Sequence, residues 1–136
     1  MALVLDTGVV VAALMRDDRH HAGCRRLIDE TSEPLVLPSP VLPEIDYWVS
    51  RTGPGPMIGL LGEIEAGSFV VEDLEHEDYP RVAELVDRYS DQDLGCVDAS
   101  VLAVVERLGE RRLATLDHRH FSVIRPRHVD ALELVP

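Results

Sequence analysis

The sequence contains no lysine and no asparagine, so all 13 of its strongly basic side chains are arginines. The absence of lysine excludes mechanisms that depend on an ammonium group, such as Schiff-base chemistry. It also disfavours phosphoaspartate proteins, which usually place a lysine beside the phosphoryl group to stabilise its charge. Any cationic chemistry in this chain must therefore come from arginine, histidine or a bound metal ion.

Cysteine and long apolar segments are equally scarce. The two cysteines, Cys24 and Cys96, have neither CxxC spacing nor a Cys/His ligand pattern, so we expect reduced thiols in a reducing compartment. No apolar run approaches the roughly 20 residues of a membrane span, and the N-terminus lacks the basic region of a signal peptide. These absences predict a cytoplasmic protein with no membrane association.

Positive charge is also in deficit, because the formal net charge is -12 and the pI is about 4.7. This balance is unfavourable for nucleic-acid binding, which depends on neutralising phosphates. Two features soften the objection: bound cations offset clustered carboxylates, and the basic residues are grouped along the chain. The groups are Arg16, Arg19, His20, His21, Arg25 and Arg26, and then His118, Arg119, His120, Arg125, Arg127 and His128.

The length of 136 residues and a hydrophobic content of 46% predict one compact domain, residues 1–136. Predicted strands alternate with predicted helices, which is typical of an α/β fold: an αβα sandwich with a central, mostly parallel sheet. The expected strands are Ala2–Leu5, Leu35–Leu37, Phe69–Val71, Arg112–Leu116 and Leu132–Val135. The expected helices are Val9–Leu14, Arg19–Glu30, a helix from Pro40 to Val49, Met57–Ala66, one carrying Val82 to Tyr89, and Val97–Leu108.

Three local patterns refine these elements. Ser39 followed by Pro40 predicts a helix start, with serine as the N-cap and proline as the first helical residue. On the helix from Arg19, the expected core contacts are Ala22, Leu27 and Ile28. The segment His118–Phe121 is expected to form a polar turn.

Four carboxylates stand at element ends. Asp6 and Asp117 each follow a strand, whereas Glu44 and Asp98 each lie near the beginning of a helix. In an open parallel sheet both kinds of position lie at the carboxyl edge of the strands, where ligands bind. Singly, each of these residues is explained as a helix cap or as a complement to the helix dipole. Together they predict one acidic rim.

Four carboxylates at one rim repel one another unless a cation holds them ionised. A set of oxygen ligands suits a hard ion, so the expected cofactor is Mg²⁺ or Mn²⁺. Zinc is the alternative, because His118 and His120 flank Asp117. However, residues two apart in a turn point in different directions, and no third His or Cys has ligand spacing.

The segments around these carboxylates resemble those of the VapC family, the PIN-domain toxins of bacterial toxin-antitoxin pairs. The resemblance covers essentially the whole chain. Each motif is short, but all four occur in the right order. They are Leu3-Val4-Leu5-Asp6-Thr7, Pro43-Glu44-Ile45-Asp46, Asp98-Ala99-Ser100 and Leu113-Ala114-Thr115-Leu116-Asp117, with Tyr89-Ser90-Asp91 ahead of the third.

The resemblance implies a PIN-like fold, an endoribonuclease activity with Mg²⁺ or Mn²⁺, an antitoxin partner that blocks the acidic site, and a homodimer. The catalytic and metal-binding residues that it implies are Asp6, Glu44, Asp98 and Asp117, with Thr7 and Thr115 as supporting hydroxyls. Two departures stand out. Gly8 occupies a position where the family often has a small polar residue, and Pro43 directly precedes Glu44, which makes the start of that helix ambiguous.

Two other classes of function stay open on the sequence alone. A phosphoaspartate protein also places Asp at strand ends, but it needs a basic partner, and Asp6 is not followed by a second Asp two residues on. A non-catalytic module with an acidic rim for a basic peptide is the second alternative, because a fold does not certify an activity. The RNA target and the number of ions are left open.

Overall fold

The structure is a computed structural model, and it describes all residues, 1–136. Five short strands form one sheet in the order β3-β2-β1-β4-β5, and every neighbouring pair is parallel. The predicted α/β class is therefore confirmed, with a sheet that is parallel throughout. The strands are β1 (Leu3–Leu5), β2 (Leu35–Pro38), β3 (Val70–Glu72), β4 (Arg112–Ala114) and β5 (Glu133–Val135).

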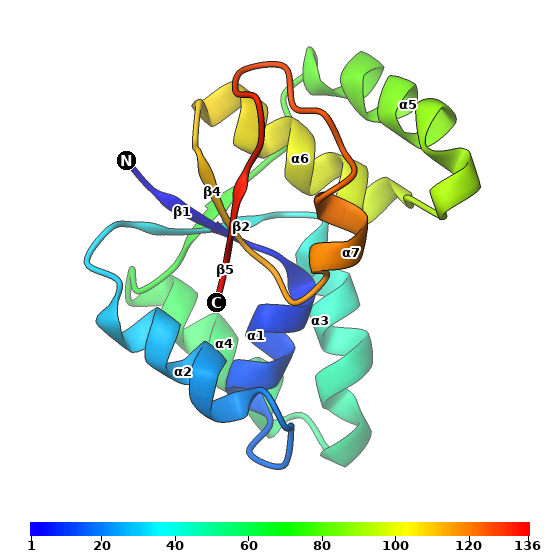
Figure 1. Ribbon diagram of the computed structural model, residues 1–136. Helices are drawn as coiled ribbons and strands as arrows, with labels where there is room; N and C mark the ends of the chain where they lie inside the picture. The colour runs from blue at the N-terminus through cyan, green and yellow to red at the C-terminus, as the bar shows by residue number, and fades with distance from the viewer.

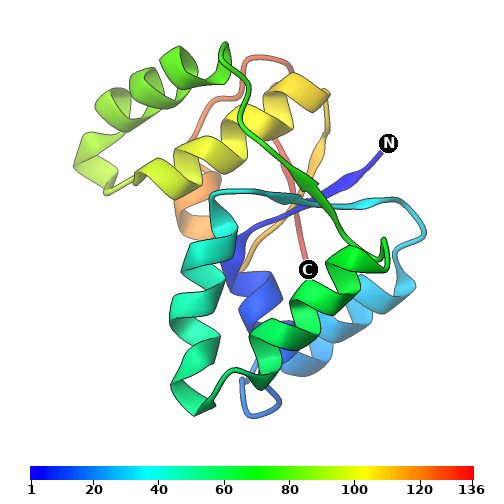
Figure 2. The ribbon, with the colours of Figure 1, turned by 180° about the vertical axis from the view of Figure 1, so that it is seen from behind.

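Helices cover both faces of this sheet. Figures 1 and 2 show α1 to α4 on one side and the α5–α6 pair on the other, with the short α7 beside the end of β4. None of the helices is both long and apolar enough to cross a bilayer. They are α1 (Thr7–Leu14), α2 (His21–Glu30), α3 (Val41–Val49), α4 (Gly55–Glu65), α5 (Asp78–Arg88), α6 (Cys96–Leu108) and α7 (His118–Phe121), with 3-10 turns η1 (Ser50–Thr52) and η2 (Ser90–Gln92).

The chain reverses its direction across the sheet beside β1. From β1 it adds β2 and then β3 on one side, and it returns through α5 and α6 to place β4 on the other side of β1. The segments that leave β1 and β4 therefore diverge at the carboxyl edge. Such a switch point is where open parallel sheets leave room for a ligand.

The central strands and helices have continuous apolar sequences because they lie in the core. All residues of β1 and β2 are buried, because helices cover both faces of a parallel sheet. Helix α1 packs between its neighbours and buries residues on several sides, as its apolar sequence predicts. On the other face α6 buries a continuous stretch from Ala99 to Val105.

Most predicted ends of helices and strands lie within two residues of the observed ends. The prediction that Ser39 caps the helix before Glu44 is wrong. Helix α3 begins at Val41 after Pro40, and no side chain caps it. The Ser39 backbone N–H instead donates to the carbonyl oxygen of Glu72, at 2.8 Å. Pro43 thus falls in the first turn, where backbone N–H groups have no helical partner in any case. The proline costs α3 no hydrogen bond and leaves Glu44 in the first turn.

Two further predictions are corrected. Ala22 is exposed, and Cys24 supplies the buried contact of α2 together with Ile28, because α2 is rotated about its axis relative to the expected orientation. The segment His118–Phe121 is a single helical turn rather than an irregular one. Asp117 caps that turn by accepting a hydrogen bond from the backbone N–H of His120.

A buried ion pair fixes α5 against α6, the helix that carries Asp98. The Arg81 guanidinium donates to both carboxylate oxygens of Glu106, at 2.8 and 2.9 Å, and only 7% and 9% of these two side chains are exposed. By contrast, the Arg25–Asp29 pair on α2 is 44% and 57% exposed. The two pairs have similar distances but very different environments.

We expect Arg81→Ala to lower the free energy of unfolding by about 3 kcal/mol, because it leaves the buried Glu106 carboxylate without a countercharge and with only the backbone N–H of Arg127 as a hydrogen-bond donor. The matched control, Arg25→Ala, should cost less than about 1 kcal/mol, because water screens the exposed pair. Urea denaturation followed by circular dichroism measures both. Equal losses for the two variants would contradict the assigned role of the Arg81–Glu106 pair.

Candidate active site

All four predicted carboxylates line one pocket at the switch point of the sheet. The pocket has a volume of about 560 Å³. Asp6 follows β1, Asp117 follows β4, and Glu44 and Asp98 lie in the first turns of α3 and α6. The lining consists of Asp6, Thr7, Gly8, Val11, Asp18, Glu44, Trp48, Asp98, Leu116 and Asp117.

Asp6 is the most deeply buried of the four, at 5% exposure. One carboxylate oxygen accepts the Thr7 backbone N–H at 2.8 Å, and the other accepts the Thr115 hydroxyl at 2.9 Å. Burial raises the pKa of Asp6 to about 6, since the loss of hydration outweighs these hydrogen bonds, and the charges of Glu44 and Asp117 add to the rise.

Thr115 joins the ends of the two central strands. Its hydroxyl donates to Asp6 and accepts the backbone N–H of Asp117 at 3.0 Å. One buried hydroxyl therefore positions carboxylates that are more than a hundred residues apart in sequence. Thr115 was predicted as a supporting hydroxyl, and these are the hydrogen bonds that it makes at the site.

Asp98 differs from Asp6 in having no hydrogen bond from any side chain or cap. Its pKa is raised to about 7, first by burial and then by the neighbouring charges of Asp6, Asp117 and Glu44, while His120 opposes them. Such a carboxyl half-ionises near neutral pH when no cation is bound. A strongly shifted carboxyl in a pocket is characteristic of a functional site.

His120 is a contact that the sequence reasoning did not assign to the site. Its Nδ1 lies 2.6 Å from a carboxylate oxygen of Asp117, and this hydrogen bond raises the pKa of the imidazole. His120 follows Asp117 by three residues, and this spacing predicts a contact between the two side chains only if α7 is known to be helical. His118, in contrast, directs Nε2 to the Thr115 carbonyl oxygen at 3.0 Å. The two histidines thus have separate partners, which does not favour a zinc site.

The lining also contains two residues without a predicted role. Asp18, in the turn after α1, adds a fifth carboxylate, and Trp48 extends the α3 side of the pocket one turn beyond Glu44. No arginine lines the pocket. Apart from His120 beside Asp117, the protein places no cationic side chain against these carboxylates, and the basic partner required by phosphoaspartate chemistry is missing.

The donor set fits a hard divalent cation. The Thr7 hydroxyl is buried, lines the pocket and has no hydrogen-bond partner, so one oxygen ligand remains unused beside the carboxylates. As they stand, no three His, Cys, Asp or Glu side chains are close enough to coordinate one ion directly. Mg²⁺ keeps several of its waters and takes only one or two carboxylates, so this wider spacing suits it.

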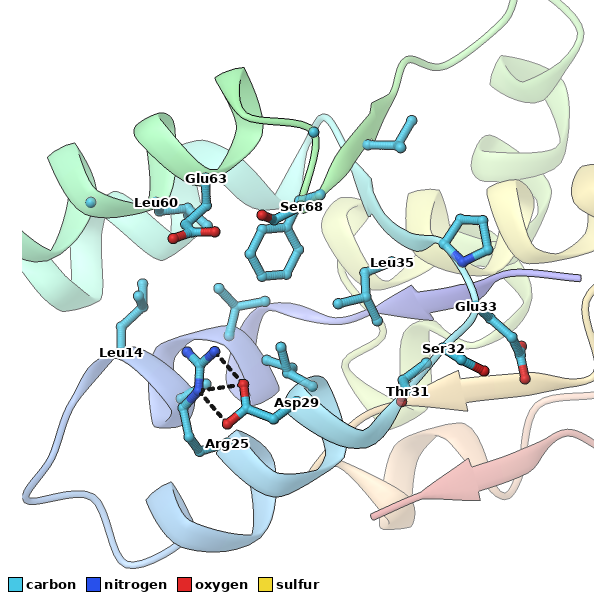
Figure 3. A pocket seen from close by; sticks show the side chains of 18 residues that line it. Leu14, Arg25, Asp29, Thr31, Ser32, Glu33, Leu35, Leu60, Glu63 and Ser68 are labelled. Carbon is cyan, nitrogen blue, oxygen red and sulfur yellow. Dashed lines mark hydrogen bonds and ion pairs between the residues drawn. The ribbon is translucent and has the colours of Figure 1, made fainter.

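A second, larger pocket of about 830 Å³ lies elsewhere. Figure 3 shows its walls, formed by α1, α2 and α4 near the starts of β2 and β3, with the Arg25–Asp29 ion pair at one side. It contains none of the four carboxylates. Its size does not make it the catalytic candidate, because it lacks a group of side chains suited to catalysis or metal binding.

Comparison with known proteins agrees with this architecture. The family profile of the PIN domain matches residues 3–125. The chain is also 30% identical to Ribonuclease VapC26 of Mycobacterium tuberculosis over 125 residues, 91% of this chain and 93% of that protein. The chain therefore belongs to the PIN-domain family. Within that family it is of the VapC type.

Solved structures confirm the fold. The toxin VapC20 of M. tuberculosis, which cleaves the sarcin-ricin loop, aligns with a TM-score of 0.79 at 19% identity, covering 86% of this chain and 91% of that one. A chain of VapBC2 from Rickettsia felis, solved with a promoter DNA fragment, gives 0.72 at 18% identity, with full coverage of both chains. FitAcB from Neisseria gonorrhoeae gives 0.63 at 14%, covering 98% and 96%.

The raised pKa of Asp98 predicts how stability changes with pH in a chelating buffer. Asp98 ionises near pH 7 in the folded chain but near 3.8 when exposed, so the folded state binds its proton more tightly. The stability from this group is present below pH 4 and is lost as the pH rises through 7. We therefore expect Asp98→Asn to lose less unfolding free energy than wild type between pH 4 and pH 8.

The control is Asp29→Asn, which removes an exposed carboxylate whose pKa the Arg25 guanidinium lowers. Its shift has the opposite sign, so this variant should not flatten the profile. Urea unfolding at each pH, with EDTA present throughout, gives the free energies. Parallel curves for wild type and Asp98→Asn would mean that Asp98 is an ordinary helix-start carboxylate.

Proposed function

We propose that this chain is a divalent-metal-dependent endoribonuclease, using Mg²⁺ or Mn²⁺, and acts as the toxin of a toxin-antitoxin pair. The observation that carries the proposal is the convergence of Asp6, Glu44, Asp98 and Asp117 on one pocket that no arginine lines. A protein that gathers this much negative charge at a switch point lowers its own stability. A bound cation explains why the arrangement persists.

The four carboxylates are the proposed metal-binding and catalytic residues. Asp6 is fixed by Thr7 and Thr115, so its oxygens are directed before any ligand arrives. Asp98 and Glu44 project from the starts of helices, and Asp117 is held by the first turn of α7. Held this way, the carboxylates would bind a cation and orient the attacking water by accepting its hydrogen bonds, and they do not react themselves. A divalent cation bound among them supplies the charge that lowers the pKa of that water and stabilises the leaving oxygen.

The proposed substrate is RNA, and the proposed partner is an antitoxin protein. Ribonuclease VapC26 is named as a ribonuclease, and VapBC2 was solved as a toxin-antitoxin assembly on DNA. A homodimer and a cytoplasmic location are part of the same proposal. They are tested by sedimentation of the purified chain and by cell fractionation.

The non-catalytic alternative has one attraction, since an acidic rim binds a basic peptide without any chemistry. A peptide cation at the rim requires neither the buried, unpartnered Thr7 hydroxyl nor an Asp98 carboxyl with a raised pKa. The non-catalytic alternative therefore leaves both features unexplained. A nuclease assay separates the two readings. Phosphoaspartate chemistry is not supported, because both oxygens of Asp6 accept hydrogen bonds and no arginine lines the pocket.

Removing one ligand charge should abolish cleavage. We expect Asp6→Asn, Asp98→Asn and Asp117→Asn each to reduce Mn²⁺-dependent RNA cleavage by more than about 100-fold, because altering even the outer shell of a metal site commonly costs 10–100-fold. Asp130→Asn is the matched control, since Asp130 is exposed and lies outside the pocket.

Circular dichroism verifies that each variant is folded, and a thermal shift with added Mn²⁺ reports metal binding. Binding at 100 times Kd stabilises a fold by about 2.7 kcal/mol, which raises the melting temperature of a domain of this size by roughly 3 to 8 °C. Cleavage at the wild-type rate by any two of the three variants would refute the proposed site.

The antitoxin should inhibit by presenting a basic side chain to the acidic rim, where it takes the place of the cation. The protein encoded by the neighbouring upstream reading frame is the partner to test. Reversing the charge of its contacting arginine should restore cleavage while leaving part of the binding. An antitoxin that inhibits equally well after this reversal would show that it acts away from the four carboxylates.

A further inference from the structure

An exposed aromatic patch borders the acidic pocket. It consists of Tyr47 and Trp48 on α3 and Arg51 in η1, and we call these three residues the rim patch. The two rings meet edge to face, with centroids 5.2 Å apart and an interplanar angle of 86°. The Arg51 guanidinium lies 4.7 Å from the Trp48 centroid and 5.6 Å from that of Tyr47.

These two neighbouring rings are largely exposed to solvent. Tyr47 is 65% exposed and Trp48 is 46% exposed, and among the six Phe, Trp and Tyr residues the other exposed ring, Tyr79, stands on α5. Leaving large apolar rings in water forgoes the free energy of burying them. An exposed group of this kind marks a surface that contacts a ligand or partner.

The rim patch is continuous with the proposed catalytic pocket. Trp48 follows Glu44 by four residues, so the two side chains lie on the same face of α3, one turn apart. Trp48 is itself part of the pocket lining. A polynucleotide whose phosphate lies at the carboxylates therefore places its adjacent nucleotide within reach of this ring.

We infer that the rim patch is a stacking platform for a base of single-stranded RNA that flanks the cleaved phosphate, with Arg51 contacting the neighbouring backbone. The inference rests on the proposed ribonuclease function and specifies how the substrate is held. Aromatic faces hold unpaired bases without regard to sequence, and a stacked guanidinium adds charge for the phosphate. Trp48 and Arg51 are positioning residues, not catalytic ones.

Position favours RNA as the occupant. Trp48 lines the same pocket as the carboxylates, so a strand whose phosphate is bound there reaches the patch without leaving the site. Five carboxylates and no arginine line the pocket, so an RNA strand needs a cation at its edge, and Arg51 supplies one that two rings already hold in place. A second copy of this chain carries the same net charge of -12 and has no phosphate group to bring to a cation bound at the carboxylates.

The test uses Trp48 itself, because it is the chain's single tryptophan and its fluorescence reports stacking directly. The protein is the full chain with Asp98→Asn, which under the proposed function binds RNA without cutting it. The probe is a fluorescein-labelled single-stranded RNA of about ten nucleotides, within the range of known single-strand sites. We expect this RNA to quench the tryptophan emission on binding.

Affinities for the same RNA are then compared by fluorescence anisotropy. In the Asp98→Asn background, Trp48→Ala should raise Kd about five- to a hundredfold, and Trp48→Phe should recover most of the loss, because it retains a stacking face. Arg51→Gln should raise Kd and reduce its salt dependence by about one phosphate contact. Tyr79→Ala is the matched control, since Tyr79 is also exposed but lies on α5, away from the pocket.

Each result decides the inference. Quenching together with the loss at Trp48→Ala and none at Tyr79→Ala supports it. Unchanged affinity in Trp48→Ala, while wild type still cleaves RNA, overturns the platform and leaves the proposed function standing. A changed sedimentation coefficient with unchanged RNA affinity assigns the patch to a subunit contact and also overturns it. A wild-type chain that neither binds nor cleaves RNA overturns both proposals.

Discussion

Repulsion among carboxylates at the switch point is the constraint on which the site depends. The chain reverses across the sheet beside β1, and the diverging segments after β1 and β4 carry Asp6 and Asp117 into the opening. The Thr115 hydroxyl holds both, by donating to one and accepting the backbone N–H of the other. This bridge keeps like charges together in a place where burial has already weakened their hydration.

The same carboxylates also begin helices, so the structural and functional interpretations of each residue coexist. Asp6 caps α1 and Asp117 caps α7, while Glu44 and Asp98 lie in the first turns of α3 and α6. The helix starts attract negative charge and offset part of the repulsion. For Asp98 this is insufficient, and its pKa remains near 7. At neutral pH Asp98 therefore lowers the stability of the chain, which is the cost expected of a carboxylate kept for the proposed ligand site.

The distribution of arginines explains how an acidic chain is compatible with an RNA substrate. Several arginines are committed to ion pairs that hold the architecture together: Arg25, Arg81, Arg107, Arg112 and Arg127. They neutralise carboxylates on α2, β3, α5, α6 and the loops, none of which lines the pocket. Arg51 is stacked on two rings beside the pocket and is not a member of any of these ion pairs. Local placement of charge, rather than its sum, sets what the surface contacts.

Much of this was determined by the sequence alone. Apolar runs and helical periodicity located the elements, and the rule that strand ends and helix starts share one edge of a parallel sheet predicted that four distant carboxylates meet. Only the tertiary structure brought Trp48 and Asp18 to the same pocket and His120 against Asp117. It also turned Cys24 rather than Ala22 into the core and made His118–Phe121 helical. These features depend on how each helix is rotated against its neighbours, and packing between segments far apart in sequence sets that rotation.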